Sequence, residues 1–116
     1  MRFCFDLDGV ICSLRRPSET YDDVTPLPGA IETLKALRRQ GHTVIIHTAR
    51  HMKTQGGDVG RVLATQGLVT LNWLQDHDVE YDEIVFGKPW ADVYIDDNAV
   101  RFSTWVDLNE TLTQLT

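Results

Sequence analysis

Two short apolar runs, separated by one amphipathic segment, constrain the fold of this chain most strongly. The run that opens the chain at residues 2–5 and the β-branched run Thr43–Thr48 have the length and composition of buried strands. Between them, residues 30–39 place apolar side chains at helical spacing and charged side chains on the opposite face. A strand, a helix and a second strand within about 45 residues form a βαβ unit, which requires parallel pairing and a right-handed crossover.

The same alternation continues through the second half of the chain. The pattern predicts a break at Gly67, a helix over residues 68–76, strands at Glu83–Phe86 and residues 92–97, and a closing helix within residues 102–116. We therefore predict an α/β fold with three layers, Rossmann-like, around a central parallel sheet. A length of 116 residues fits one domain, so residues 1–116 are predicted to form a single domain.

The composition narrows the classes of partner. With 17 acidic and 11 basic residues the net charge is −6, which argues against nucleic acid as a partner because phosphate backbones attract basic surfaces. No run approaches the ~18 apolar residues of a membrane-spanning helix, so no membrane partner is expected. The two cysteines are too few for a disulfide framework, and we expect a reducing, cytoplasmic setting.

Functional side chains gather where the predicted strands end. In parallel sheets, ligands bind outside the carboxyl ends of the strands. Asp6 and Asp8 follow the first strand, Thr48 ends the second, Lys88 follows the third, and the acidic pair at residues 96–97 ends the fourth. Four segments would thus deliver carboxylates, a hydroxyl and an amine to one rim of the sheet.

This set of groups suits phosphoryl transfer. Carboxylate oxygens favour Mg²⁺, which Asp6 and Asp96 could hold beside a phosphate. A lysine and a threonine hydroxyl can neutralise and hydrogen-bond the remaining phosphate oxygens. One carboxylate can then attack phosphorus to form an aspartyl-phosphate, while a second protonates the leaving alcohol and later activates water.

These motifs resemble those of the haloacid dehalogenase (HAD) superfamily of aspartate-nucleophile phosphotransferases. The superfamily signature is Asp-x-Asp-Gly after the first strand, Thr or Ser after the second, a downstream Lys and a final acidic pair, and all four occur here in that order. The segments His-Thr-Ala-Arg (47–50), Gly-Lys-Pro-Trp (87–90) and Tyr-Ile-Asp-Asp (94–97) are also similar to small HAD proteins named as capsular-polysaccharide-biosynthesis phosphatases.

The resemblance implies a role for each matching residue. Asp6 would be the nucleophile and a metal ligand, and Asp8 would be the general acid and base, with its main-chain carbonyl on the metal. Thr48 and Lys88 would bind phosphate. The remaining Mg²⁺ ligands would be Asp96 and, directly or through water, Asp97.

Two features distinguish the chain from larger HAD members. Val10 stands where the motif often carries Thr, which removes a hydroxyl near the motif. The gaps between the predicted strands hold no segment long enough for a cap domain, so we expect no cap and an open site. Arg50, His51 and Lys53, in the loop of residues 50–60, are candidates to contact the leaving group of the substrate; the alternative is a solvated basic loop.

The sequence thus predicts a Mg²⁺-dependent phosphomonoesterase that acts through an aspartyl-phosphate on a small phosphate ester. The similarity to the capsular-polysaccharide-biosynthesis phosphatases favours a sugar or polyol phosphate as the substrate. Two alternatives stay open: a phosphorylation-dependent signalling module similar to the receiver domains of response regulators, and an inactive HAD-like binding subunit. The order of the motifs disfavours the first alternative, because receiver domains carry their acidic pair early. A rim without a cap is compatible with a homo-oligomer.

Overall fold

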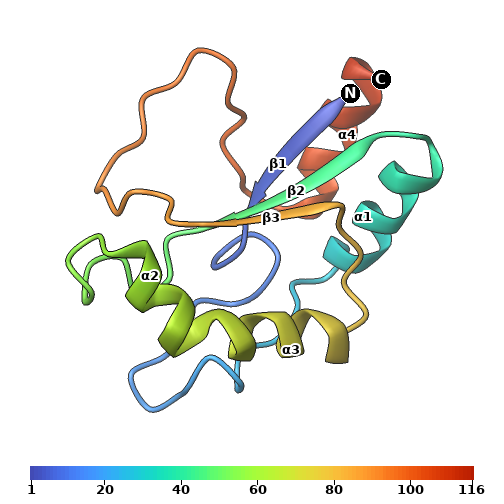
Figure 1. Ribbon diagram of the computed structural model, residues 1–116. Coiled ribbons are helices and arrows are strands. Elements are labelled where there is room, and N and C mark those ends of the chain that lie inside the picture. Colours follow the sequence, from blue (N-terminus) through green and yellow to red (C-terminus); the bar gives the residue numbers. More distant parts are fainter.

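The computed structural model describes residues 1–116 and contains one parallel sheet of three strands in the order β1-β2-β3 (Figure 1). The strands are β1 (Arg2–Asp6), β2 (Thr43–Thr48) and β3 (Glu83–Phe86). Asp6 pairs with His47, which in turn pairs with Val85, so the three carboxyl ends lie at the same edge of the sheet. The predicted α/β fold with a central parallel sheet is confirmed.

Helices follow the strands along the chain. They are α1 (Ala30–Arg39), α2 (Val59–Val62), the π-helical turn η1 (Leu63–Gly67), α3 (Leu68–Asp76) and α4 (Trp105–Leu115). The predicted helices between the first two strands and at the end of the chain are confirmed. None of the helices is long and apolar enough to cross a membrane.

The predicted break at Gly67 is wrong. The chain continues without interruption from α2 through η1 into α3, and Gly67 keeps a right-handed helical conformation with φ −58°. A glycine inside a helix costs about 1 kcal/mol relative to alanine. Gly67 is buried, and a Cβ atom there would make only ordinary contacts with Leu63 at 3.8 Å, so the helical conformation is held by tertiary packing and not by the residue type.

The helices and one face of the sheet share a single core of 16 buried residues. Phe5, Val44 and Ile46 supply the strand side chains of this core, and Trp73 and Trp105 anchor α3 and α4 in it. The opposite face of the sheet is open to solvent: Cys4 is exposed and Val85 keeps 46% of its surface accessible. The helical layer therefore lies on one face of the sheet, and the other face carries no helix, so the third layer of the predicted arrangement is absent.

The predicted fourth strand at residues 92–97 is wrong. These residues form no ladder with the sheet, and Ile95 is 96% exposed on a wide loop between β3 and α4 (Figure 1). The apolar alternation satisfies the local requirements of a strand, but parallel pairing also needs a crossover of roughly a dozen residues or more. Only residues 87–91 separate β3 from this segment, so the connection is too short for such a crossover.

Close contact at Gly29 fixes α1 against α4. Gly29 precedes α1 with φ 92°, and a Cβ atom there would lie 2.9 Å from the Cβ of Trp105. The indole Nε1 of Trp105 donates to the carbonyl of Val10 at 2.8 Å, and its ring lies 5.7 Å from that of Phe5. The last helix thereby secures the chain just beyond β1.

Gly29→Ala should destabilise the protein more than Gly41→Ala. Gly41 has a similar φ of 86° but no atom within 4 Å of an added Cβ, so it is a matched control for backbone strain alone. We expect about 1–2 kcal/mol for Gly41→Ala from the left-handed conformation. The contact with Trp105 should add about 1–3 kcal/mol for Gly29→Ala. Urea titrations give the free energy of unfolding of each variant. Equal destabilisation by Gly29→Ala and Gly41→Ala would contradict a tight α1–α4 contact.

Candidate active site

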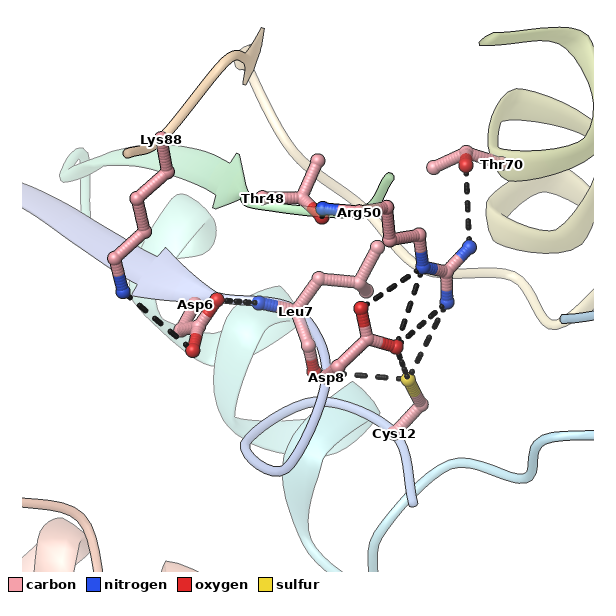
Figure 2. Close-up of polar contacts among 8 residues, drawn as sticks. All are labelled: Asp6, Leu7, Asp8, Cys12, Thr48, Arg50, Thr70 and Lys88. Carbon is pink, nitrogen blue, oxygen red and sulfur yellow. Dashed lines mark hydrogen bonds and ion pairs between the residues drawn. The ribbon is translucent and has the colours of Figure 1, made fainter. Parts of the chain in front are cut away.

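Asp6, the last residue of β1, lies between a backbone donor and a lysine (Figure 2). Its Oδ1 accepts the N–H of Leu7 at 2.9 Å, and its Oδ2 lies 3.5 Å from the Nζ of Lys88. Partial burial raises the pKa of the Asp6 carboxyl, and the Lys88 ammonium opposes this shift. The side chain keeps 37% of its surface accessible, so it is partly open to solvent.

Lys88 reaches the site because the chain turns immediately after β3. Its backbone N–H donates to the carbonyl of Thr48 at 3.1 Å, which ties the start of the loop to the end of β2. The ammonium lies 4.1 Å from the centre of the Tyr94 ring and faces Asp6 on its other side. The structure therefore brings the predicted nucleophile and the predicted phosphate-binding lysine together.

Thr48 ends β2 and is 1% exposed. Its Oγ1 accepts the backbone N–H of Arg50 at 3.1 Å. No protein acceptor takes the hydroxyl proton, but the side chain is enclosed on the same face of β2 as Val44 and Ile46, so its contact with phosphate stays a prediction.

Asp8 lies beyond the strand end and is turned to Arg50, away from Asp6 (Figure 2). The Nε of Arg50 donates to both carboxylate oxygens of Asp8, at 2.9 Å to Oδ2 and 3.2 Å to Oδ1. The Nη2 of Arg50 donates to Oδ1 at 3.0 Å. Asp6 and Asp8 thus have separate partners, a partly exposed lysine for Asp6 and a buried arginine for Asp8.

Arg50 is turned into the protein, which corrects its interpretation as a substrate contact. Its side chain is fully enclosed, with 0% accessible surface. Its Nη1 donates to the hydroxyl of Thr70 in α3 at 3.1 Å, and its guanidinium carbon lies 4.2 Å from the centre of the Tyr21 ring. Every part of the guanidinium has a protein partner, so its contacts are internal.

The thiol of Cys12 completes the surroundings of this ion pair. Its Sγ lies 3.4 Å from Oδ1 of Asp8 and 3.6 Å from the carbonyl oxygen of Leu7, the two acceptors for its one proton, and it accepts from Nη2 of Arg50 at 3.6 Å. Burial, together with the nearby Asp8 carboxylate, raises the pKa of Cys12 to about 12. The thiol therefore stays neutral and acts as a hydrogen-bond donor to Asp8.

The two other basic candidates of this loop lie nearer the surface. His51 packs against Tyr21 with 5.5 Å between ring centres, and partial burial lowers its pKa, helped by Arg15 and Arg50. The Nζ of Lys53 lies 4.3 Å from the centre of the Trp90 ring. Both side chains remain able to meet a ligand, and their contact with substrate stays a prediction.

The acidic residues do not form a metal site in this arrangement. Asp96 and Asp97 are exposed on the loop after β3, and Asp96 caps its own turn by accepting the N–H of Asn98 at 3.2 Å. This hydrogen bond lowers the pKa of Asp96. No group of three or more acidic, histidine or cysteine side chains lies close enough to hold a metal ion. The set predicted for Mg²⁺ is therefore split between the strand end and the loop.

A polar hollow elsewhere on the surface is unsuited to phosphate. It lies beside Thr43 and Asp82, at the amino ends of β2 and β3, opposite the rim that carries Asp6. The guanidinium of Arg38 in this hollow is already paired with Asp82 at 3.0 Å and with Glu80 at 3.0 Å. Its mixed charge and its position set it apart from the candidate site.

Three partners of the site were not found from the sequence. Tyr21 lies in a polar loop with no regular pattern, and nothing in the sequence connects it with Arg50. Thr70 precedes the buried Trp73 by three positions, a helical spacing that places it on the buried face of α3 and was the available signal. Cys12 carried no signal beyond its closeness to the first motif.

Asp6→Asn and Asp8→Asn should change stability in opposite directions. Asp6→Asn removes a partly desolvated charge and should stabilise the metal-free protein at neutral pH. Because the folded-state pKa of Asp6 is raised, this advantage should shrink as the pH falls through that pKa. Asp8→Asn leaves the buried Arg50 unpaired and should cost about 2–4 kcal/mol, somewhat below a fully buried pair because Asp8 is partly accessible. Urea titrations in EDTA test both, and equal losses would contradict this assignment of environments.

Comparison with solved structures places the fold among known proteins. A crystal structure of a target protein from Vibrio cholerae matches 99% of this chain and 98% of its own, with 32% identity and a TM-score of 0.79. The D,D-heptose 1,7-bisphosphate phosphatase from B. bronchiseptica, solved with magnesium and phosphate, matches 78% of this chain at 20% identity and a TM-score of 0.51. That match spans about half of the phosphatase.

Comparison with protein-family models and with curated proteins gave no match. The match to the Vibrio cholerae structure shows a family relationship, because the identity is 32% over 99% of the chain. The match to the phosphatase shows a similar fold and no more, because the identity is only 20%. The chain therefore belongs to the family of the Vibrio cholerae protein and has an α/β fold resembling that of a HAD-like phosphatase.

Proposed function

We propose that this protein is a HAD-type phosphomonoesterase that forms an aspartyl-phosphate at Asp6. The observation that carries the proposal is the contact between Asp6 and Lys88, whose Oδ2 and Nζ atoms lie 3.5 Å apart at the rim of the sheet. A nucleophilic carboxylate beside a fixed cation is what attack on a phosphate dianion requires, because the cation offsets the repulsion between two anions. Thr48 lies at the end of the neighbouring strand with a hydroxyl proton to donate.

In the first step, Oδ2 of Asp6 bonds to phosphorus while the bond to the leaving oxygen breaks. Oδ1 is engaged by the N–H of Leu7, which orients the carboxylate and leaves Oδ2 as the attacking atom. Lys88 and Thr48 bind the phosphoryl oxygens. Asp8 gives its proton to the leaving alkoxide, which departs as an alcohol.

In the second step, water attacks the phosphorus of the aspartyl-phosphate. Asp8, now a carboxylate, takes a proton from this water, and the bond between phosphorus and Oδ2 of Asp6 breaks. Inorganic phosphate leaves, and Asp6 returns to its ionised form. One residue thus serves as acid in the first step and as base in the second.

Mg²⁺ dependence is part of the proposal and is supported by the magnesium in the heptose bisphosphate phosphatase of similar fold. When bound, the ion would supply positive charge beside the phosphate. Its proposed ligands are Asp6, Asp8, Asp96 and Asp97, of which the last two lie on the exposed loop. The proposal therefore requires the loop after β3 to bring Asp96 to Asp6 when the ion binds.

The proposed substrate class is a sugar or polyol phosphate. The name of the structurally similar phosphatase, which acts on a heptose bisphosphate, supports it. Trp90 and Tyr94, each about 50% exposed on the loop after β3, offer flat apolar surfaces of the kind that carbohydrate rings pack against.

Turnover of phosphate monoesters should disappear in Asp6→Asn. We expect loss of multiple turnover on every ester that the wild type hydrolyses, measured as phosphate release in a panel of sugar, polyol and nucleotide monophosphates. A labelled phosphoryl group should be trapped on the wild type by rapid acid quench and should be absent from the variant. Turnover that survives in Asp6→Asn would contradict a covalent intermediate on this residue.

The same panel separates catalysis from signalling. One labelled phosphate per chain without further turnover on any ester would favour the receiver-like alternative. Hydrolysis should stop in EDTA and return when Mg²⁺ is added. Activity that persists in EDTA would contradict the proposed Mg²⁺ dependence without affecting the role of Asp6.

Asp96→Asn should weaken Mg²⁺ binding, whereas Asp92→Asn should leave it unchanged. Both residues are exposed on the same loop, so Asp92 is a matched control for loss of one negative charge. We expect at least a 10-fold increase in the dissociation constant for Asp96→Asn, because the site loses a direct ligand. Calorimetric titration with MgCl₂ measures the constants, and equal values for the two variants would remove Asp96 from the ligand set.

A further inference from the structure

We infer that Arg50 is a positioning residue that clamps Asp8 in one orientation and makes Oδ2 the oxygen that transfers the proton. This inference rests on the proposed function, since Asp8 has a proton to transfer only if the protein is a phosphatase. Arg50 itself touches no substrate, because its side chain has no accessible surface. It acts through Asp8.

The clamp treats the two oxygens of Asp8 unequally (Figure 2). The single N–H of Nε is shared, with the shorter branch to Oδ2 at 2.9 Å and the longer one to Oδ1 at 3.2 Å. Oδ1 also accepts from Nη2 of Arg50 at 3.0 Å and faces the Sγ of Cys12 at 3.4 Å, whereas Oδ2 has no further donor. A carboxylate oxygen has two lone pairs, so Nη2 and the thiol engage both lone pairs of Oδ1, and Oδ2 keeps one free. Oδ2 is therefore the atom at which a proton can be held and passed on.

The clamp is itself held from three sides. The Nη1 of Arg50 donates to Thr70 in α3, its backbone N–H donates to Thr48 in β2, and its guanidinium stacks on Tyr21. A buried guanidinium that lost its carboxylate would be an unpaired charge in the interior, which is strongly unfavourable. Asp8 therefore stays paired, and it acts from the clamp through the 21% of its side chain that remains accessible.

Loss of the contact between Arg50 and Asp8 should affect proton transfer more than the other steps of the reaction. A general acid works only within hydrogen-bonding distance of the oxygen that it protonates, so a carboxylate free to rotate would lose most of its benefit. Leaving groups that are already stable as anions do not need the proton. Loss of the clamp should therefore slow phosphoenzyme formation from alkyl phosphates much more than from an ester with a good leaving group.

The test compares Arg50→Gln with the wild type on glycerol phosphate and on para-nitrophenyl phosphate. We expect phosphoenzyme formation in Arg50→Gln to fall ~100-fold or more with glycerol phosphate and less than ~10-fold with para-nitrophenyl phosphate. With the nitrophenyl ester, the variant should release a burst of nitrophenol and then accumulate phosphoenzyme, because the second step also needs Asp8. Arg61→Gln, which removes an exposed arginine on α2, is the matched control and should leave both rates unchanged.

A second pair of variants keeps the test decisive if Arg50→Gln fails to fold. Thr70→Val removes the hydroxyl that holds Nη1 and retains every charge, whereas Thr70→Ser keeps the hydroxyl. We expect Thr70→Val to show the same dependence on the leaving group with a loss of about 10-fold on glycerol phosphate, and Thr70→Ser to restore the rate. A folding defect alone would lower the rates with both substrates by equal factors, and Thr70→Ser would not restore them.

The outcomes separate this inference from the proposed function. If the wild type hydrolyses neither ester nor any other monoester, the proposed function fails and the inference fails with it. If the wild type turns over but Arg50→Gln and Thr70→Val slow the two esters by equal factors, only the positioning role is overturned. Faster turnover in either variant would likewise overturn it, since Arg50 would then be restraining Asp8 in an unproductive orientation.

Discussion

Burial of one guanidinium organises the region around the candidate site. Moving an arginine side chain out of water costs several kcal/mol unless charge and hydrogen bonds are restored inside the protein. Arg50 recovers them from segments far apart in the sequence, with Asp8 beyond β1, Thr70 in α3 and Tyr21 in the polar loop. These segments cannot separate without exposing the guanidinium of Arg50 or leaving it without a partner. The ion pair thereby sets where the first motif lies relative to the helical layer.

The two carboxylates of the first motif, only two positions apart, occupy different electrostatic environments. Asp6 is partly desolvated and faces a lysine at 3.5 Å, a weak pair at the rim. Asp8 is held by a buried arginine with shorter contacts. This difference suits the separate roles proposed for the two residues, nucleophile and proton carrier. The strand end separates the two environments because β1 stops at Asp6 and the chain turns before Asp8.

The sequence predicted the parts of the fold that depend on local pattern. The βαβ unit, α1, β3 and α4 follow from apolar spacing, and the positions of Asp6 and Lys88 follow from strand ends. It did not predict the outcomes that depend on distant partners. Gly67 stays helical because burial outweighs its local preference. Residues 92–97 form no strand because the connection from β3 is too short. Arg50 was interpreted as a surface residue because its partners lie 20 to 42 positions away.

The hydrogen bond from Trp105 to the carbonyl of Val10 spans 95 positions of the chain and joins the last helix to the loop that carries Asp8. During synthesis at ~5–20 residues per second, that loop waits roughly 5 to 20 seconds for its partner to be made. An emerging chain can pair β1 with β2 well before this time, but its acid–base loop still lacks the indole that secures it. The position of Asp8 is then fixed later than the pairing of the strands that carry Asp6 and Thr48, and a chain that stops short of Trp105 leaves this loop without its anchor.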